Sequence, residues 1–251
     1  MKYYLSIIAT VMLFVAGCRS TSKDPVAGSC KKQQPIRVAV VTGGHGFEKE
    51  PFLDLFAGHE DIQPVHIPLQ DHSEIFEETA DWPYDCIVLF NMTQKISPKR
   101  QANFIELLKN GTGLVALHHA IGAYQTWPEF EKIIGGKYYL PETAKSQGHK
   151  PSGYKHDVEF TVTINDKDHT VTKGIENFTI NDETYKDCVF EPDNLVLLTT
   201  TDPTSDRSIG WARSYQNARI CYIQPGHGKP CFEDENYRKL IANAIRWAGG
   251  G

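Results

Sequence analysis

The feature that most constrains this chain is an alternation of short apolar runs with segments of helical periodicity. Four apolar, β-branched runs predict strands, at 37–42, 65–67, 84–90 and 113–117. Helical spacing separates or follows most of them, at 52–58, 97–111 and 130–134. This alternation predicts a parallel sheet with helices on both faces, and 251 residues suffice for one large α/β domain.

The pattern changes in the second half of the chain. Apolar residues alternate with polar ones from Val158 to Ile164, as in a half-exposed antiparallel strand. Further strand-like runs and a final amphipathic helix follow, at 195–200, 208–213, 218–223 and 237–248. The stretches 136–156 and 182–185 show no such period and are predicted to be loops. The expected fold is therefore a mostly parallel sheet with extra antiparallel strands.

The first 35 residues are expected to lie outside this domain. Lys2, an apolar stretch at 5–15 and the ending Val15-Ala16-Gly17-Cys18 resemble the signal and lipobox of bacterial lipoproteins. The apolar stretch is shorter than the roughly 20 residues of a spanning helix, and the alternative is an ordinary signal peptide with an incidental cysteine. We expect a signal peptide at 1–17, lipidation of Cys18, a tether at 18–35 and a domain at 36–251. The protein would then be an exported lipoprotein, anchored to the membrane by its lipid alone, in the periplasm or at the cell surface.

Charge and cysteine content exclude several classes of function. The net charge is −5 and no run of Lys or Arg occurs, so nucleic acid is not an expected partner. The five cysteines besides Cys18 form no CxxC pair, which argues against a metal knuckle or a redox motif. None is expected to be a nucleophile, and a bridge between Cys188 and Cys231 is left open. The GxxxxGK[ST], HExxH and GxSxG motifs are absent from the sequence.

Histidines follow directly after several predicted strands. Ligands of open α/β sheets bind beyond the carboxyl ends of the parallel strands. The residues that four strands would deliver to that edge are His45, Asn91, the pair His118 and His119, and His227. Because neighbouring residues at a strand end point in opposite directions, we expect one of the paired histidines, His119, to face the pocket. A single histidine in such a position is usually a hydrogen-bonded structural residue. The group of histidines at one edge of the sheet predicts a site.

Several motifs, in this order along the chain, resemble the ThuA-like (trehalose-utilisation) family. They are VVTGGHGF at 40–47, GTGLVALHHA at 111–120, Gly135-Gly136, DHTVTKG at 168–174, DETY at 182–185, and the ending YIQPGHG…NAIRWAGG. The resemblance implies a flavodoxin-like fold similar to class I glutamine amidotransferases, and a role in the use of sugars. Amidotransferases carry a Cys nucleophile at the strand-to-helix turn, where this chain has Leu117-His118-His119-Ala120, so thiol catalysis is not expected.

We therefore expect an enzyme of carbohydrate utilisation that acts on a sugar, disaccharide or keto-sugar, as a hydrolase, lyase or isomerase. Imidazoles would serve as general acids and bases because histidine titrates near neutral pH. The expected catalytic residues are His45, His119, His149, Glu183 and His227. The expected substrate contacts are Phe47, Asn91, His118, Trp127, Tyr185 and Trp211. The alternative function is a non-catalytic sugar-binding lipoprotein.

A divalent metal is a variant of the enzyme hypothesis that the sequence leaves open. Imidazole-rich sites suit zinc and similar ions, and the candidate ligands are His45, His119, His149 and His227. No two of them are spaced as ligands within a single element, so the sequence does not choose among them. No other cofactor is expected, and the oligomeric state is not determined by the sequence.

Overall fold

A computed structural model describes residues 34–92 and 95–250 of the protein. The expected signal peptide, the tether up to residue 33 and the expected lipidation site Cys18 lie outside these residues. Within the described part of the chain, no helix is long and apolar enough to cross a membrane. The family resemblance predicted a mostly parallel α/β sheet with helices on both faces, and this fold class is confirmed.

One nine-stranded sheet organises the described residues, in the order β2-β1-β3-β4-β11-β10-β9-β6-β7. Its parallel half consists of β2 (Ile62–Pro68), β1 (Ile36–Gly43), β3 (Cys86–Asn91), β4 (Gly113–Leu117) and β11 (Ala218–Ile223). The edge strand β2 is largely exposed, but the other four strands are apolar and buried because both of their faces are covered, as is usual in parallel sheets. Their carboxyl ends all point to one edge of the sheet.

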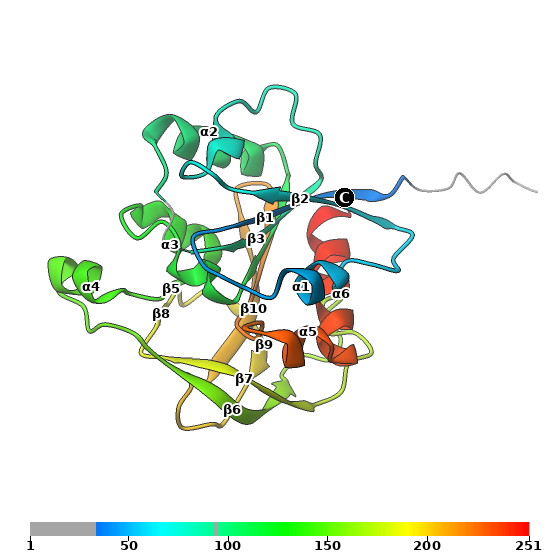
Figure 1. Ribbon diagram of the computed structural model, residues 1–251, viewed down its shortest axis with the longest axis vertical. Helices are drawn as coiled ribbons and strands as arrows, with labels where there is room; N and C mark the ends of the chain where they lie inside the picture. The colour runs from blue at the N-terminus through cyan, green and yellow to red at the C-terminus, as the bar shows by residue number, and fades with distance from the viewer. Residues whose placement is uncertain (1–33, 93–94, 251) are drawn as a thin grey trace, which may run out of the picture. The chain divides into compact units, whose positions relative to one another are not determined.

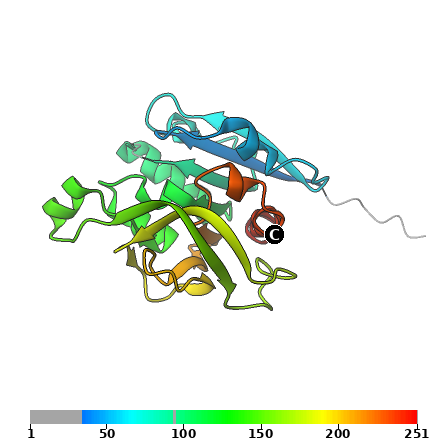
Figure 2. The same cartoon turned by 60° about the horizontal axis from the view of Figure 1, so that its bottom comes forward.

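Four antiparallel strands continue the sheet beyond β11, and we call them the antiparallel extension. They are β10 (Ser208–Tyr215), β9 (Leu195–Thr199), β6 (Gly153–Ile164) and β7 (Phe178–Lys186). A separate two-stranded sheet joins β5 (Gly136–Lys137) to β8 (Val189–Phe190). Figure 2 shows β6 and β7 running side by side as a long ribbon, which their pairing register also records.

Helices cover both faces of the parallel half (Figure 1). The helices α1 (Lys49–Asp54), α5 (Lys229–Phe232) and α6 (Glu235–Gly249) pack on one face. The helices α2 (Pro98–Lys109) and α3 (Pro128–Ile134) pack on the other, with the short 3-10 turns η1 (Glu74–Phe76) and η2 (His118–Gly122). Side chains of β1 alternate between the two faces of the sheet. Val38 and Val40 pack toward α1, α5 and α6, whereas Ala39 and Val41 pack toward α2 and α3.

Local signals in the sequence set the ends of the two longest helices. The Ser97 side chain caps α2 by accepting a hydrogen bond from the backbone N–H of Arg100, and Pro98 occupies the first turn. The Asp234 carboxylate caps α6 in the same way through the N–H of Tyr237, at 2.9 Å. These caps satisfy backbone donors that the first helical turn leaves without partners.

Two predicted loops contain regular structure instead. Residues Pro141–Gln147 form helix α4, and β6 already begins at Gly153. The segment 182–185 lies inside strand β7, although it was predicted to be a loop. Its residues Asp182 to Tyr185 are all buried, so the strand does not show the alternation of apolar and polar residues that normally marks one.

Candidate functional site

A pocket of about 180 Å³ opens at the edge where the parallel strands end. Its polar lining consists of His45, His118, His119, His156 and Glu183, and its aromatic lining of Tyr138, Tyr154 and Tyr185. Met92, Ile121, Gly122 and Leu140 complete the wall. We call this cavity the imidazole pocket. It is smaller than the ~300–1,000 Å³ typical of drug-sized ligands, so it suits a small molecule or one ring of a larger one.

His118 is fixed in position and tautomer by its surroundings. Its Nδ1 lies 2.7 Å from the carbonyl oxygen of Gln224, which can only accept, so Nδ1 carries the hydrogen. The lone pair of Nε2 therefore faces the pocket, where the Tyr185 hydroxyl donates to it at 2.9 Å. The backbone carbonyl of His118 accepts a hydrogen bond from the Tyr222 hydroxyl. Complete burial lowers the pKa of His118 to about 3 and keeps the ring neutral.

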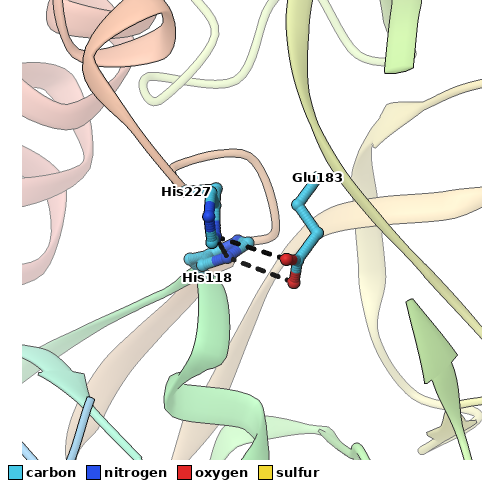
Figure 3. Close-up of side chains that lie close together, drawn as sticks. All are labelled: His118, Glu183 and His227. Atoms are coloured by element: carbon cyan, nitrogen blue, oxygen red, sulfur yellow. Dashed lines mark hydrogen bonds and ion pairs between the residues drawn. The ribbon is translucent and has the colours of Figure 1, made fainter. Parts of the chain in front are cut away.

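Glu183 lies between three imidazoles. Its Oε2 is 2.7 Å from Nδ1 of His156 and 3.3 Å from Nδ1 of His227, and its Oε1 is 3.7 Å from Nε2 of His118. Figure 3 shows His118, Glu183 and His227 pointing toward one another from three separate elements. The Glu183 side chain is only 8% exposed, so its charge is shielded from water and interacts strongly with these neighbours.

His156 was not predicted, and a β-bulge explains its placement. Lys155 pairs with Thr184 and Val158 pairs with Asp182, so two residues of β6 oppose the single residue Glu183 of β7. Asp157 within the bulge adopts a positive φ of 56°. The bulge turns His156 toward Glu183. The only signal in the sequence is the loss of the period-two pattern on the amino-terminal side of Val158.

Asp182 ties the turn after β11 to strand β7. Its carboxylate accepts the backbone N–H groups of Gly226, at 2.6 Å, and of His227, at 2.9 Å. Gly226 has a φ of 137°, and a Cβ there would lie 2.5 Å from the Tyr237 hydroxyl, so the turn requires glycine. Burial raises the pKa of Asp182 to about 6. This turn delivers His227 to the Glu183 carboxylate.

His119 and His45 form the opposite wall of the pocket. The His119 ring lies 4.7 Å from the His45 ring and 4.3 Å from that of Phe90. Both ring nitrogens of His119 are buried and have no hydrogen-bond partner among the described residues. Burial lowers the pKa of His119 well below its ordinary value. In the exposed His45, Nδ1 donates to the Gly46 carbonyl at 2.7 Å, which leaves the Nε2 lone pair available.

Comparison with known proteins places this chain in a family. The model of the ThuA family, described as trehalose utilisation, matches residues 37–248. The chain belongs to the ThuA family. Membership supports a role in carbohydrate utilisation. No curated protein sequence matches the chain.

Solved structures share the fold of this ThuA-family protein. A ThuA-like protein of Parabacteroides merdae superposes with a TM-score of 0.71 at 19% identity, over 86% of this chain and 90% of that one. For a ThuA-like protein of Bacteroides uniformis, the TM-score is 0.62 at 23% identity, over 86% and 92%. A cytoplasmic protein of Salmonella typhimurium gives 0.59 at 15% identity, over 85% and 99%. Such low identities establish the fold alone.

The structure of the ThuA-family domain brings together six of the residues proposed from the sequence. They are His45, His118, His119, Glu183, Tyr185 and His227. Both paired histidines contribute, because the chain enters the turn η2 at His118, whose φ is 49°, instead of continuing as an extended strand. The alternating directions expected of a strand end therefore do not apply there.

His149 does not line the imidazole pocket, so the structure does not bring it together with the other expected catalytic residues. It follows the end of α4, where its backbone N–H bonds to the carbonyl of Ala144. Its exposed ring stacks on Tyr139 at 4.3 Å. The sequence predicted a loop over 136–156 that could approach the strand ends, whereas helix α4 forms there and His149 follows it outside the pocket lining.

Four expected substrate contacts also lie outside the pocket lining. Trp127 and Trp211 are buried in the core, and Trp211 donates from Nε1 to the Ile134 carbonyl at 2.7 Å. Phe47 packs against Phe52 and Phe90 at about 5 Å. Asn91 is buried and donates to the Tyr124 hydroxyl. Large aromatic side chains gain most from burial, and the aromatic residues that line the pocket are tyrosines instead.

The described cysteines are free and lie away from the pocket lining. Cys86, Cys188, Cys221 and Cys231 form no disulfide with one another, including the Cys188–Cys231 pair that the sequence left open. Burial raises the pKa of the Cys221 thiol to about 12, and it also raises the pKa of the other three thiols. A buried thiol of this kind stays protonated and is a poor nucleophile.

Proposed function

We propose that this protein is an enzyme of carbohydrate utilisation that transfers protons at a sugar or keto-sugar held in the imidazole pocket. The observation that carries the proposal is the convergence of five imidazoles and the Glu183 carboxylate, of which only His118 and His119 share an element. The family match supports the substrate class, because the family is described as trehalose utilisation. Burial of so many titratable groups in one place is unfavourable for stability and is typical of active sites.

The pocket-facing imidazoles are the proposed proton donors and acceptors. His45 and His156 lie at the exposed rim, where they can exchange protons with water. His119 is buried and neutral, and its two partnerless nitrogens can hydrogen-bond to a substrate hydroxyl or carbonyl. General acid–base catalysis by positioned side chains typically contributes 10²–10⁴ in rate.

Tyrosines are the proposed surfaces for the sugar ring. Tyr154 is 62% exposed at the mouth, and it pairs across the strands with Tyr185, which lies inside. Tyr138 completes the wall at 5.0 Å from Tyr185. Phenol rings offer an apolar face for the C–H groups of a sugar and a hydroxyl for hydrogen bonding. The small pocket volume favours one ring inside, with any second ring beside Tyr154.

The decisive experiment follows the purified protein with trehalose, other disaccharides and their 3-keto derivatives in D₂O by NMR. Abstraction of a proton beside a carbonyl appears as deuterium incorporation, and hydrolysis, elimination or isomerisation appears as product. We expect turnover of at least one of these sugars. The double variant His45→Ala/His119→Ala should lose at least about 10²-fold of that rate. A matched control replaces the off-pocket His59 and His66 by Ala and should retain the rate.

Two outcomes would overturn the proposal. Sugar binding without turnover by the wild-type protein would favour the alternative, a non-catalytic sugar-binding lipoprotein. Equal rates in the double variant and its control would place the chemistry away from the imidazole pocket. Circular dichroism of each variant shows whether the fold is kept.

We also propose that the protein is exported and anchored to the envelope through a lipid on Cys18, with a small carbohydrate as its partner. The support is the short apolar segment and the VAGC ending of the sequence, outside the described residues. Cells labelled with a palmitate analogue should incorporate it into the wild-type protein and not into Cys18→Ser. Equal labelling of the two would contradict the proposal.

A further inference from the structure

We propose that His118, Glu183 and His227 bind one divalent transition-metal ion, with zinc as the representative ion. The ligand atoms are Nε2 of His118, a carboxylate oxygen of Glu183 and Nδ1 of His227, which all lie within 4.8 Å of one another. The inference deepens the proposed function, since it rests on the same pocket and adds a cofactor to it. Metal binding is nevertheless measured without any substrate.

Distances between the three side chains fit a shared metal. Nε2 of His118 is 3.3 Å from Nδ1 of His227, and that atom is 3.3 Å from Oε2 of Glu183. Oε1 of Glu183 lies 3.7 Å from Nε2 of His118. Two ligands at ~2.0–2.1 Å from a tetrahedral zinc are about 3.3–3.4 Å apart, so an ion fits with only small side-chain movements.

The hydrogen bonds around His118 prepare it as a ligand. Its Nδ1 hydrogen goes to the Gln224 carbonyl, which leaves the Nε2 lone pair facing Glu183 and His227. Histidines that bind metals almost always donate their other ring N–H to a carbonyl or carboxylate in this way. The Tyr185 hydroxyl donates to the Nε2 lone pair at 2.9 Å. A cation bound at Nε2 would displace this one contact.

Other residues hold the remaining two ligands. His156 contacts Oε2 of Glu183 through Nδ1 at 2.7 Å and orients the carboxylate. Asp182 fixes the backbone of His227 through two N–H bonds to the turn. Each proposed ligand therefore has a supporting hydrogen-bond partner, as ligands of functional metal sites generally do.

The donor set points to the class of ion and to its use. Two imidazoles and one carboxylate suit zinc or ferrous iron, whereas magnesium and calcium prefer oxygen ligands alone. Three protein ligands leave a fourth position open to water or substrate, as in catalytic zinc sites. His119, with both nitrogens buried and without partners, lines the same pocket and offers a hydrogen bond to whatever occupies that position.

This ligand set differs from the four histidines that the sequence suggested. Only His227 is common to both sets, because His149 lies beyond α4 and the other two histidines form the opposite wall. The sequence could not supply Glu183 as a ligand, since its strand brings it to His118 from 65 residues away.

The test measures zinc binding to the purified protein after dialysis against a chelator, by elemental analysis and isothermal titration calorimetry. We expect one Zn²⁺ per chain, and at least about 10-fold weaker binding in Glu183→Gln and in His227→Ala. His149→Ala, which removes an exposed imidazole elsewhere, should bind like the wild type. Glu183→Gln preserves side-chain size and His227 is partly exposed, so at least one folded variant is expected.

The outcomes separate this inference from the proposed function. Absence of stoichiometric Zn²⁺ binding, or equal affinity in both ligand variants and the wild type, would overturn the metal site. Full turnover of a sugar by metal-free protein would overturn the role of the ion as a cofactor, while leaving the proposed enzyme intact. Stoichiometric binding that Glu183→Gln weakens, in a protein that turns over no sugar, would support the metal site and contradict the proposed enzyme.

Discussion

The two halves of the sheet contribute to the pocket in different ways. In the parallel half, the strands themselves are apolar, and the site residues follow them in turns: His45 after β1, His118 after β4, and His227 after β11. In the antiparallel extension the site residues lie within the strands, with His156 in β6 and Glu183 in β7. The parallel half therefore acts as a scaffold whose strand ends lead into site residues, whereas the extension carries site residues within its own strands.

This difference predicts which substitutions should affect stability as well as chemistry. A residue in a surface turn can change without disturbing the core, but a buried carboxylate in a strand influences both stability and chemistry. Asp182 and Glu183 are adjacent in β7 and illustrate the two effects. Asp182 accepts backbone N–H groups of the turn that contains His227, whereas Glu183 contacts three imidazoles. Variants of residues in the strands and in the segments outside them should separate effects on stability from effects on turnover.

The largest expected effect comes from Glu183→Gln, which removes the one carboxylate that lines the pocket among the described residues while keeping the side-chain shape. Because this group contacts three imidazoles, we expect turnover of a productive sugar to fall by about 10²–10⁴-fold, with the fold retained. Steady-state kinetics on the purified variant give the ratio. Glu159→Gln, the same change at an exposed position of β6, is the matched control. A loss below 10-fold would remove Glu183 from the chemistry.

Asp182→Ala should mainly affect stability. It leaves the buried N–H groups of Gly226 and His227 without their acceptor, which we expect to lower the free energy of unfolding by about 2–5 kcal/mol. Urea denaturation followed by circular dichroism measures the change. Asp187→Ala, which breaks a surface ion pair with Lys150 near the end of β7, should cost no more than about 1 kcal/mol. Equal destabilisation in both variants would show that the Asp182 contacts do not tie the two halves together.

The smallest effect is expected for His149→Ala. The ring is exposed in the segment after α4, where it stacks on Tyr139, so the free energy of unfolding should stay within about 0.5 kcal/mol of the wild type. Sugar turnover should be unchanged in the same preparation. A drop of 10-fold or more would return this residue to the site and show that the loop after α4 approaches the pocket during the reaction.

Prediction from sequence succeeded for features that are encoded within one strand or helix. The apolar runs located the parallel strands, and Ser97 and Pro98 located the start of α2. The rule that ligands bind beyond parallel strands brought His45, His119 and His227 to one place. Trp127 and Trp211 were expected to contact a sugar from their residue type alone, and the structure places both in the core. Their residue type suits a sugar platform and a core equally well, and only packing chooses between them.

The sequence by itself determined the strands of the parallel half, the histidines that follow them and the family motifs, because each is encoded in a short contiguous stretch. Only the tertiary structure decided that Glu183 lies in a strand, that a bulge turns His156 toward it, and that His149 lies elsewhere. The physical reason is the range of the interactions. Periodicity is set by neighbours a few residues apart, whereas His118 and His227 meet across 109 residues through the order of strands in the sheet.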